Sequence, residues 1–268
     1  MSLRDRLTGR IPDDDRATLS DRFDIIGDIA VLSLPPGLAC DGRIIASAVM
    51  EQYHGVRTVL NKISQITGDH RTARYDLLAG TSTIAHYREY GFSYEMDIKS
   101  VFFTPRLASE RNRVTGLVRE GEDLLVPFCG AGPFAIPAAA KGARVLCVEK
   151  NPEACRWLTR NIRLNHVEPR VTLVNGDAFD PGSYPARKFD RAIVPTPYGM
   201  DSILDLITPK VRPGGMIHLY TFRKKHQIQP LIDEFHGKGL DTIFFRGCGH
   251  VAPCVSRWVF DLEISGEK

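Results

Sequence analysis

The sequence predicts an α/β protein in which a large parallel-sheet domain follows a small α+β domain. The segment from Glu122 to Glu149 reads as a strand, a glycine turn, an Ala-rich helix and a second strand that ends on an acidic residue. After it, strands and helices alternate regularly, as in a parallel sheet covered on both faces. Before Phe102 the chain has short alternating runs that are typical of antiparallel strands.

The N-terminal part of the chain divides into two segments. Residues 1–22 are polar and rich in Arg and Asp, so we expect a weakly ordered lead-in with one short helix at most. Residues 23–104 form the small α+β domain. We expect a strand-turn-strand around Gly27-Asp28, a helix over 41–54, a strand over 56–66, and short antiparallel strands over 74–78, 82–89 and 92–97.

Residues 105–268 form the large domain, which starts with a helix over 107–117. The expected strands are 124–128, 145–149, 171–175, 189–194 and 215–221, and the expected helices are 133–141, 152–165, 201–208 and 228–238. Two final strands, 241–246 and 257–264, indicate an antiparallel hairpin at one edge of the sheet.

The composition is that of an ordinary soluble protein, with 43% hydrophobic residues, 25% charged residues and a net charge of +3. No apolar run approaches the roughly 20 residues that cross a bilayer, and the first residues do not resemble a signal peptide. We therefore expect a cytoplasmic monomer that binds no membrane. The six cysteines include no C-x-x-C pair, which favours buried thiols over disulfides or a zinc site, so no metal is expected.

The glycine turn is the main candidate ligand-binding segment. Gly130 and Gly132 allow a sharp turn and a close approach of the backbone to a ligand. Glu149, seventeen positions after Gly132, can accept hydrogen bonds from two ribose hydroxyls. Pro133 lacks the N–H that a pyrophosphate would need, so S-adenosylmethionine (SAM), which has a ribose and no phosphate, fits better. A generic strand-turn-helix corner is the alternative.

Other candidates follow the carboxyl ends of neighbouring strands, where parallel sheets bind ligands. Asp177 can accept a hydrogen bond from an adenine amino group, or it can simply cap a turn. Pro195 stands where amino-group methyltransferases carry an Asn that holds the target amine, so we expect either a substrate contact or a stiff loop. The candidate cofactor-binding residues are Phe128, Gly130, Ala131, Gly132, Phe134, Glu149, Lys150, Asp177, Ala178 and Pro195.

Glu110 is the candidate general base. It lies in the segment P-R-L-A-S-E-R on the helix that starts the large domain, with Arg106 one turn earlier on the same face. A carboxylate with a neighbouring cation at a cleft suits proton abstraction. The alternative is a simple surface ion pair between Arg106 and Glu110.

The sequence resembles a pair of families in seven stretches: VLNKISQITGDHRTARYDLLAG, HYREYGFSYEMDI, VFFTPRLASER, GAGPF, NIRLNHV, FDRAIV and GGMIHLYTF. These look like the archaeal and eukaryotic tRNA guanine-37 N1-methyltransferases and their sister family, the wybutosine-pathway aminocarboxypropyl transferases. The resemblance covers roughly residues 24–264. It implies a class I SAM-dependent methyltransferase (Rossmann-like) domain, SAM as cofactor and the anticodon stem-loop of tRNA as partner.

The resemblance also implies roles for single residues. Glu110 matches the residue proposed as base for guanine N1, and Arg71 matches an Arg proposed to contact the substrate guanosine. Arg106 looks like the methyltransferase branch. Val126 departs from the acidic residue usual at the end of the first strand, and Pro195 departs from the usual Asn.

The resemblance favours N1-methylation of guanosine 37 and leaves two alternatives. Transfer of the 3-amino-3-carboxypropyl group of SAM to the wyosine precursor is supported by Pro195 and by the lack of an extra N-terminal module. A non-catalytic SAM- and tRNA-binding module is the other. In each case we expect one basic face to hold the tRNA, formed by Arg71, Arg74, Arg106, Arg111 and the cluster Arg223–Lys225.

Overall fold

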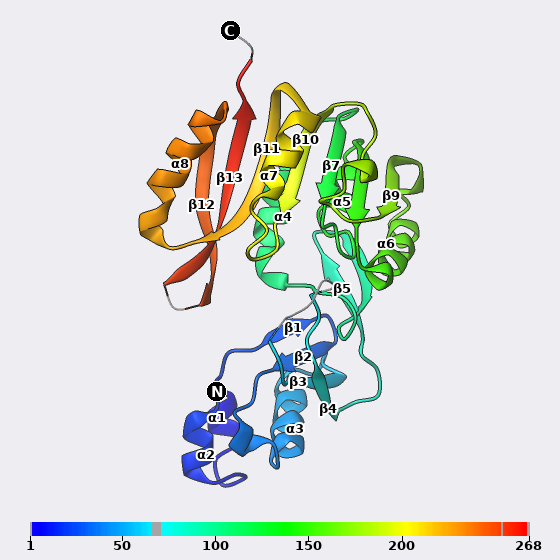
Figure 1. Cartoon of the computed structure of the whole chain (residues 1–268). Coiled ribbons are helices and arrows are strands. Elements are labelled where there is room, and N and C mark those ends of the chain that lie inside the picture. Colours follow the sequence, from blue (N-terminus) through cyan, green and yellow to red (C-terminus); the bar gives the residue numbers. More distant parts are fainter. Residues whose placement is uncertain (1, 66–70, 253, 267–268) are drawn as a thin grey trace. The chain divides into compact units, whose positions relative to one another are not determined.

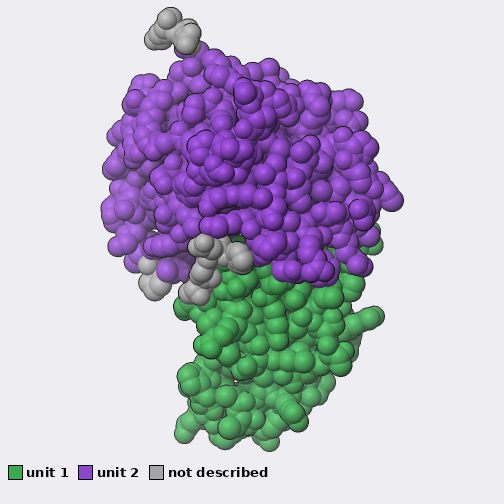
Figure 2. All heavy atoms as spheres, turned by 45° about the vertical axis from the view of Figure 1, so that its right-hand side comes forward, with its two compact units in different colours: residues 1–105 green, residues 106–268 purple. Residues whose placement is uncertain are grey.

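The computed structural model of this chain describes residues 2–65, 71–252 and 254–266 (Figure 1). The chain divides into two compact units, residues 1–105 and residues 106–268, which Figure 2 shows in different colours. Ile66, the last residue of the strand expected over 56–66, lies outside the described residues, as do Gly68, Asp69 and His70 of the G-D-H-R motif.

The first unit contains a four-stranded sheet in the order β1 (Asp24–Ile26), β2 (Ile29–Leu32), β3 (Thr58–Lys62) and β4 (Tyr75–Ala79). Strands β2 and β3 are parallel, so the chain crosses between them through the short helix η1 (Pro36–Leu38) and helix α3 (Gly42–Gln52). Strands β5 (Ile84–Glu89) and β6 (Phe92–Asp97) form a separate hairpin. The β1–β2 turn requires Gly27, because a Cβ there would lie 2.0 Å from the carbonyl oxygen of His86.

The first 22 residues differ from the expectation of a weakly ordered lead-in. They contain α1 (Leu3–Arg6) and α2 (Asp13–Thr18), and the Ser2 side chain accepts from the Asp5 N–H to cap α1. The aliphatic side chains of this segment are buried in the same cluster as α3: Leu3, Leu7, Ile11 and Leu19. These side chains are few and are separated by Arg and Asp residues in the sequence, so their spacing did not indicate that they are buried together.

The second unit is built on a seven-stranded sheet in the order β12-β13-β11-β10-β7-β8-β9. Five strands are parallel, namely β7 (Asp123–Pro127), β8 (Arg144–Glu149), β9 (Val171–Asn175), β10 (Phe189–Pro195) and β11 (Val211–Arg223). Strand β13 (Val255–Ile264) is antiparallel to β11, and β12 (Leu240–Ala252) pairs with it at the edge. The expected parallel sheet and its antiparallel edge hairpin are therefore confirmed.

The helices of the second unit pack on this sheet (Figure 1). They are α4 (Ala108–Leu117) with the preceding η2 (Pro105–Leu107), α5 (Ala135–Ala140), α6 (Pro152–Leu164), α7 (Ile203–Ile207) and α8 (Ile228–Gly237). The short helices η3 (Glu168–Arg170), η4 (Pro181–Ser183), η5 (Thr208–Lys210) and η6 (Lys225–Gln227) lie in the connections. Asn151 caps α6 through its side chain, as its place before Pro152 indicates.

The strand order indicates which edge of the sheet in the second unit binds a ligand. Strands β8 and β9 follow β7 on one side, whereas β10 and β11 lie on the other, so the order reverses between β7 and β10. Ligands of open parallel sheets bind outside the carboxyl ends of the strands at such a point. Over the described ranges, no helix is long and apolar enough to cross a membrane.

Candidate functional site

The loop between β7 and α5 is held in a left-handed turn. Phe128, Gly130 and Gly132 have φ values of 54°, 55° and 91°. A Cβ at Gly132 would lie 2.4 Å from Cδ1 of Leu158, so a side chain there would collide with α6. The buried Asn161 of α6 donates its side-chain N–H to the carbonyl oxygen of Ala131 at 3.1 Å. Helix α6 therefore fixes the loop, a role of Asn161 that the sequence analysis missed.

Glu149 lies at the end of β8 and faces this loop. Its Oε2 accepts from the N–H of Gly130 at 2.8 Å, and its Oε1 accepts from the N–H of Asn151 at 2.8 Å. Each carboxylate oxygen has further lone pairs, so each can accept a second donor. Two backbone groups thus aim the carboxylate, as the recognition of a ribose diol requires.

Asp177 follows β9 at the same edge. Its Oδ1 accepts from the N–H of Phe179 at 2.9 Å, and its Oδ2 lies 3.0 Å from Nζ of Lys150. The backbone hydrogen bond and the lysine lower the pKa of Asp177, so it is ionised at neutral pH. The turn cap considered as the alternative is present, yet the Asp177 side chain remains 40% exposed and accessible to a ligand.

Aromatic side chains adjoin these carboxylates. The ring of Phe128 lies 6.2 Å from that of Phe179, centroid to centroid, and Phe179 is partly exposed. Phe179 was missed in the sequence, where its position two residues after Asp177 is the available signal. Phe134 and Ala178 are buried, so their side chains support the loops. The Phe134 ring packs 5.2 Å from that of Tyr220, centroid to centroid.

Pro195 ends β10 and supplies no polar side chain. Beyond it, Tyr198 is 65% exposed, and its ring centroid lies 5.4 Å from that of Phe222. The guanidinium of Arg257 lies 5.0 Å from the centroid of the Phe222 ring. This edge therefore carries an exposed aromatic side chain, Tyr198, on which a base could stack.

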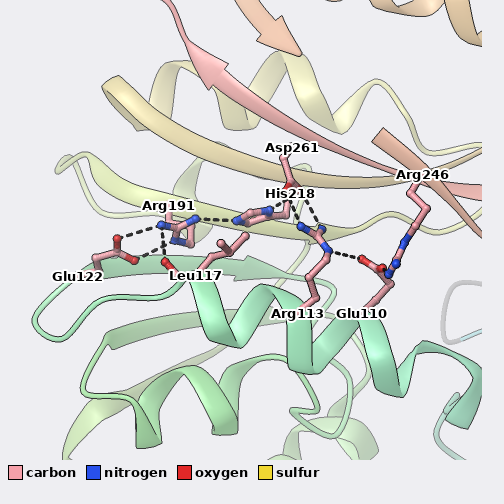
Figure 3. A network of polar contacts seen from close by, with 8 residues as sticks. All are labelled: Glu110, Arg113, Leu117, Glu122, Arg191, His218, Arg246 and Asp261. Atoms are coloured by element: carbon pink, nitrogen blue, oxygen red, sulfur yellow. Dashed lines mark hydrogen bonds and ion pairs between the residues drawn. The ribbon is translucent and has the colours of Figure 1, made fainter. Parts of the chain in front are cut away.

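Glu110 is buried, with a relative exposure of 1% (Figure 3). Its Oε2 accepts from Nε of Arg113 at 3.0 Å, and its Oε1 accepts from Nη2 of Arg246. Arg113 also forms a bidentate pair with Asp261, at 2.6 and 3.0 Å. The surface pair with Arg106 considered in the sequence analysis is wrong, because α4 turns the carboxylate into the protein.

The network continues from Asp261 across the sheet (Figure 3). His218 Nδ1 lies 2.6 Å from Asp261, and Nε2 lies 2.7 Å from Nη1 of Arg191, which also pairs with Glu122. Burial lowers the pKa of His218, so the ring is neutral, donates from Nδ1 and accepts at Nε2. Burial would raise the pKa of Asp261, but hydrogen bonds from His218 and Arg113 outweigh it and bring that pKa to about 2.

The arginines expected on one basic face differ in exposure. Arg106 is exposed, whereas Arg111 is 2% exposed and Arg223 is paired with Asp201 at 2.9 Å. Burial lowers the pKa of Arg257, and the charges of Arg106 and Arg111 lower it further. The face described from the sequence therefore does not include Arg111 and Arg223 as free surface cations.

Arg71 belongs to the first unit. It has a left-handed φ of 53°, and its guanidinium lies 5.5 Å from the ring centroid of Phe102. Arg74 lies just before β4 and is exposed. The contribution of these two arginines to substrate binding stays a prediction.

Three of the six cysteines are buried, free thiols, as the sequence favours: Cys129, Cys147 and Cys155. Burial raises the pKa of Cys155 to about 12 and that of Cys129 above its ordinary value, so both are protonated and unreactive. Among the described residues, no group of three His, Cys, Asp or Glu side chains is arranged to hold a metal ion.

The sheet order, the glycine turn after β7 and the carboxylate at the end of β8 define a Rossmann-like domain of the SAM-dependent methyltransferase class. Residues 83–236 match the TRM5/TYW2 methyltransferase domain, and residues 3–83 match the TYW2 N-terminal domain. The chain belongs to the TRM5/TYW2 methyltransferase family, which confirms the resemblance found in the sequence.

Known relatives carry both names of the family. The tRNA (guanine(37)-N(1))-methyltransferase Trm5b of Pyrococcus abyssi is 36% identical over 79% of this chain, which spans 63% of that relative's length. The tRNA 4-demethylwyosine(37)-methyltransferase Taw21 of Saccharolobus solfataricus is 32% identical over 77% of this chain and 80% of its own length. The crystal structure of P. horikoshii TYW2 in complex with MeSAdo has a TM-score of 0.76 and 28% identity, over 99% of this chain and 98% of that one.

Proposed function

We propose that this protein is a SAM-dependent tRNA-modifying enzyme that methylates N1 of guanosine 37. The observation that most supports SAM binding is the position of Glu149. Its carboxylate is held by the N–H groups of Gly130 and Asn151, at the switch point of the sheet, the edge where the strand order reverses. The relative from Pyrococcus abyssi, named for guanosine 37 methylation, supports the substrate.

The donor set at the switch point fits SAM. Glu149 would accept the two ribose hydroxyls, and Asp177 would accept from the adenine amino group. The rings of Phe128 and Phe179 offer apolar surface for the adenine. When bound there, SAM supplies the activated methyl group.

Guanine N1 carries a proton at neutral pH, so methylation requires a base, for which we propose Glu110. Arg113, itself fixed by Asp261, orients the carboxylate. A carboxylate bonded to two guanidiniums is a weak base. Arg246 is 48% exposed, so its side chain can move away from Glu110. We propose that the guanine N1–H then takes the place of the Arg246 guanidinium as the donor to Glu110 Oε1.

Two arginines complete the proposed catalytic set. Arg71 would orient the guanine oxygen, a role that rests on the family resemblance. Arg106 is exposed on η2, four residues before Glu110, where a cation can contact the RNA.

Transfer of the 3-amino-3-carboxypropyl group of SAM to a tricyclic base is the second candidate. The match of residues 3–83 to the TYW2 N-terminal domain favours it, and so does the likeness to P. horikoshii TYW2 over nearly the whole of both chains. Pro195, which lacks the side-chain oxygen of an Asn, is compatible with it. The presence of Glu110, Glu149 and Asp177 argues against a module that binds SAM and tRNA without catalysis.

The by-product of SAM distinguishes the candidates when unmodified tRNA and tRNA carrying the tricyclic precursor are offered separately. S-adenosylhomocysteine with 1-methylguanosine from unmodified tRNA is the result we expect. Methylthioadenosine from the precursor, with no product from unmodified tRNA, would establish aminocarboxypropyl transfer. S-adenosylhomocysteine from the precursor alone would indicate the activity named for the Taw21 relative, and SAM binding without any product would indicate a binding module.

A further inference from the structure

A groove of about 750 Å³ lies in the second unit between the segment after β11 and the tip of the β12–β13 hairpin. One wall carries Lys224, Lys225 and His226, and the other carries Gly247, His250 and Trp258. Its volume falls within the roughly 300–1,000 Å³ of ordinary ligand pockets. It opens beside the carboxyl end of β11, the edge at which the candidate site lies.

The charge of this groove is positive and uncompensated. Lys224 and Lys225 are exposed, and in the described part of the chain neither pairs with a carboxylate. Their neighbour Arg223 is bound to Asp201, which leaves the two lysines as the available cations of this segment. Among the described residues that line the groove, none is Asp or Glu. Such a surface favours a polyanion.

The other wall presents a flat aromatic ring. Gly247 stands opposite Trp258 in the β12–β13 ladder. Trp258 is half-buried, packs against the hydrophobic core and has the Phe245 ring 6.4 Å away, centroid to centroid. A Cβ at Gly247 would lie 3.9 Å from the indole, so glycine leaves the part of the ring that faces this position uncovered. The indole Nε1–H donates to the carbonyl oxygen of Arg223 at 3.2 Å, which fixes the orientation of the ring.

We propose that this groove binds a single-stranded stretch of RNA, with phosphates at Lys224 and Lys225 and a base against Trp258. Proteins that bind single-stranded nucleic acids without sequence preference place cations along the phosphate backbone. They also provide aromatic side chains on which the bases stack. A duplex offers no free base face to the indole, and an acidic peptide offers no base at all. The inference rests on the proposed function, in which the strand belongs to the tRNA substrate.

The charge component is tested with the double variant Lys224→Ala/Lys225→Ala and a matched control, Lys141→Ala/Lys188→Ala. The control lysines are exposed and precede β8 and β10, at the opposite edge of the same sheet. Each single-strand phosphate contact contributes about 0.7 to the slope of log K against log salt. For a uridine oligonucleotide, the slope of log K against log salt should be smaller by about 1.4 in the groove variant and unchanged in the control. An unchanged slope in the groove variant would overturn the proposal.

The stacking component is tested by fluorescence. The chain has two tryptophans, so Trp157→Phe leaves Trp258 as the sole reporter. The oligonucleotide should quench Trp258, and Gly247→Val, which covers the indole without a backbone clash, should reduce both quenching and affinity. No quenching, or equal quenching by duplex RNA or polyglutamate, would refute single-strand binding.

The two proposals fail in different ways. If the wild-type protein modifies tRNA while the groove variants keep the wild-type salt slope, only the groove proposal is wrong. If the oligonucleotide quenches Trp258 but tRNA is never modified, the groove proposal stands and the proposed function is wrong.

Discussion

Glu149 accepts from two backbone N–H groups, which fix the orientation of the carboxylate that we propose to bind the ribose. A hydrogen bond to a charged group contributes about 1.5–3 kcal/mol. Glu149→Ala should therefore weaken SAM binding about ten- to a hundredfold, as measured by calorimetry. Glu153→Ala, in the first turn of the neighbouring α6, is the matched control and should bind SAM as the wild type does. Equal affinities of the two variants would contradict the assignment.

Glu110 lies outside the proposed adenosine site, so its replacement should separate catalysis from binding. Loss of a general base typically costs about a hundred- to ten-thousandfold in rate. We expect Glu110→Gln to lose that much in single-turnover methyl transfer while its SAM affinity stays that of the wild type. Because Glu110 is buried, the melting temperature must be compared first. A folded variant that retains most of the wild-type rate would exclude Glu110 as the base.

The sequence identified both Glu149 and Glu110, but it indicated the surroundings of Glu149 better than those of Glu110. Glu149 and Gly130 are 19 positions apart within one βαβ unit, so their relation follows from a local pattern. The partners of Glu110 and Arg113 are 136 and 148 positions away, on β12 and β13. Only the fold brings them together, which is why a surface pair looked sufficient for Glu110.

At the scale of elements, the network of Figure 3 links α4 to β10, β11 and β13 through the neutral ring of His218. Its pKa is lowered from the ordinary value of 6.5, so below about pH 6.5 the unfolded chain binds a proton that the folded chain does not. The stability contributed by His218 is thus complete above that pH and is lost as the pH falls.

We therefore expect a lower free energy of unfolding at about pH 5 than at about pH 7, with a limiting slope from this residue of about 1.4 kcal/mol per pH unit. His218→Gln retains a donor and an acceptor but does not titrate, so its profile should be flatter over the same interval. Urea unfolding at several pH values measures the difference. Parallel profiles for the two proteins would show that His218 is not held neutral.

The N-terminal helices α1 and α2 are part of the core of the first unit. Leu7 lies between them and is 0% exposed, whereas Leu77 on β4 is 45% exposed. Leu7→Ala should lower the free energy of unfolding by about 2–5 kcal/mol. Leu77→Ala should change it by about 0.5 kcal/mol at most. Urea unfolding followed by circular dichroism compares the two, and equal stabilities would show that α1 and α2 are only a loosely attached lead-in.

Across the whole chain, the parallel sheet of the second unit was predictable because each strand and the helix that follows it are adjacent in the sequence. The edge hairpin was predicted too short, with strands over 241–246 and 257–264, whereas β12 runs over Leu240–Ala252 and β13 over Val255–Ile264. Gly247 and Gly249 resemble a strand end, but the ladder continues past them through a register shift between Gly247 and His250. That irregular tip forms a wall of the proposed RNA groove.

Methylation of guanosine 37 is tested by locating the methyl group that the protein transfers. The protein is incubated with SAM labelled in its methyl group and with two tRNA transcripts that differ only in guanosine or adenosine at position 37, and the digested nucleosides are identified by mass spectrometry. We expect labelled 1-methylguanosine from the guanosine transcript and no labelled nucleoside from the adenosine transcript. Label in another nucleoside, label from both transcripts, or an unlabelled aminocarboxypropyl adduct would show that the protein does not methylate N1 of guanosine 37.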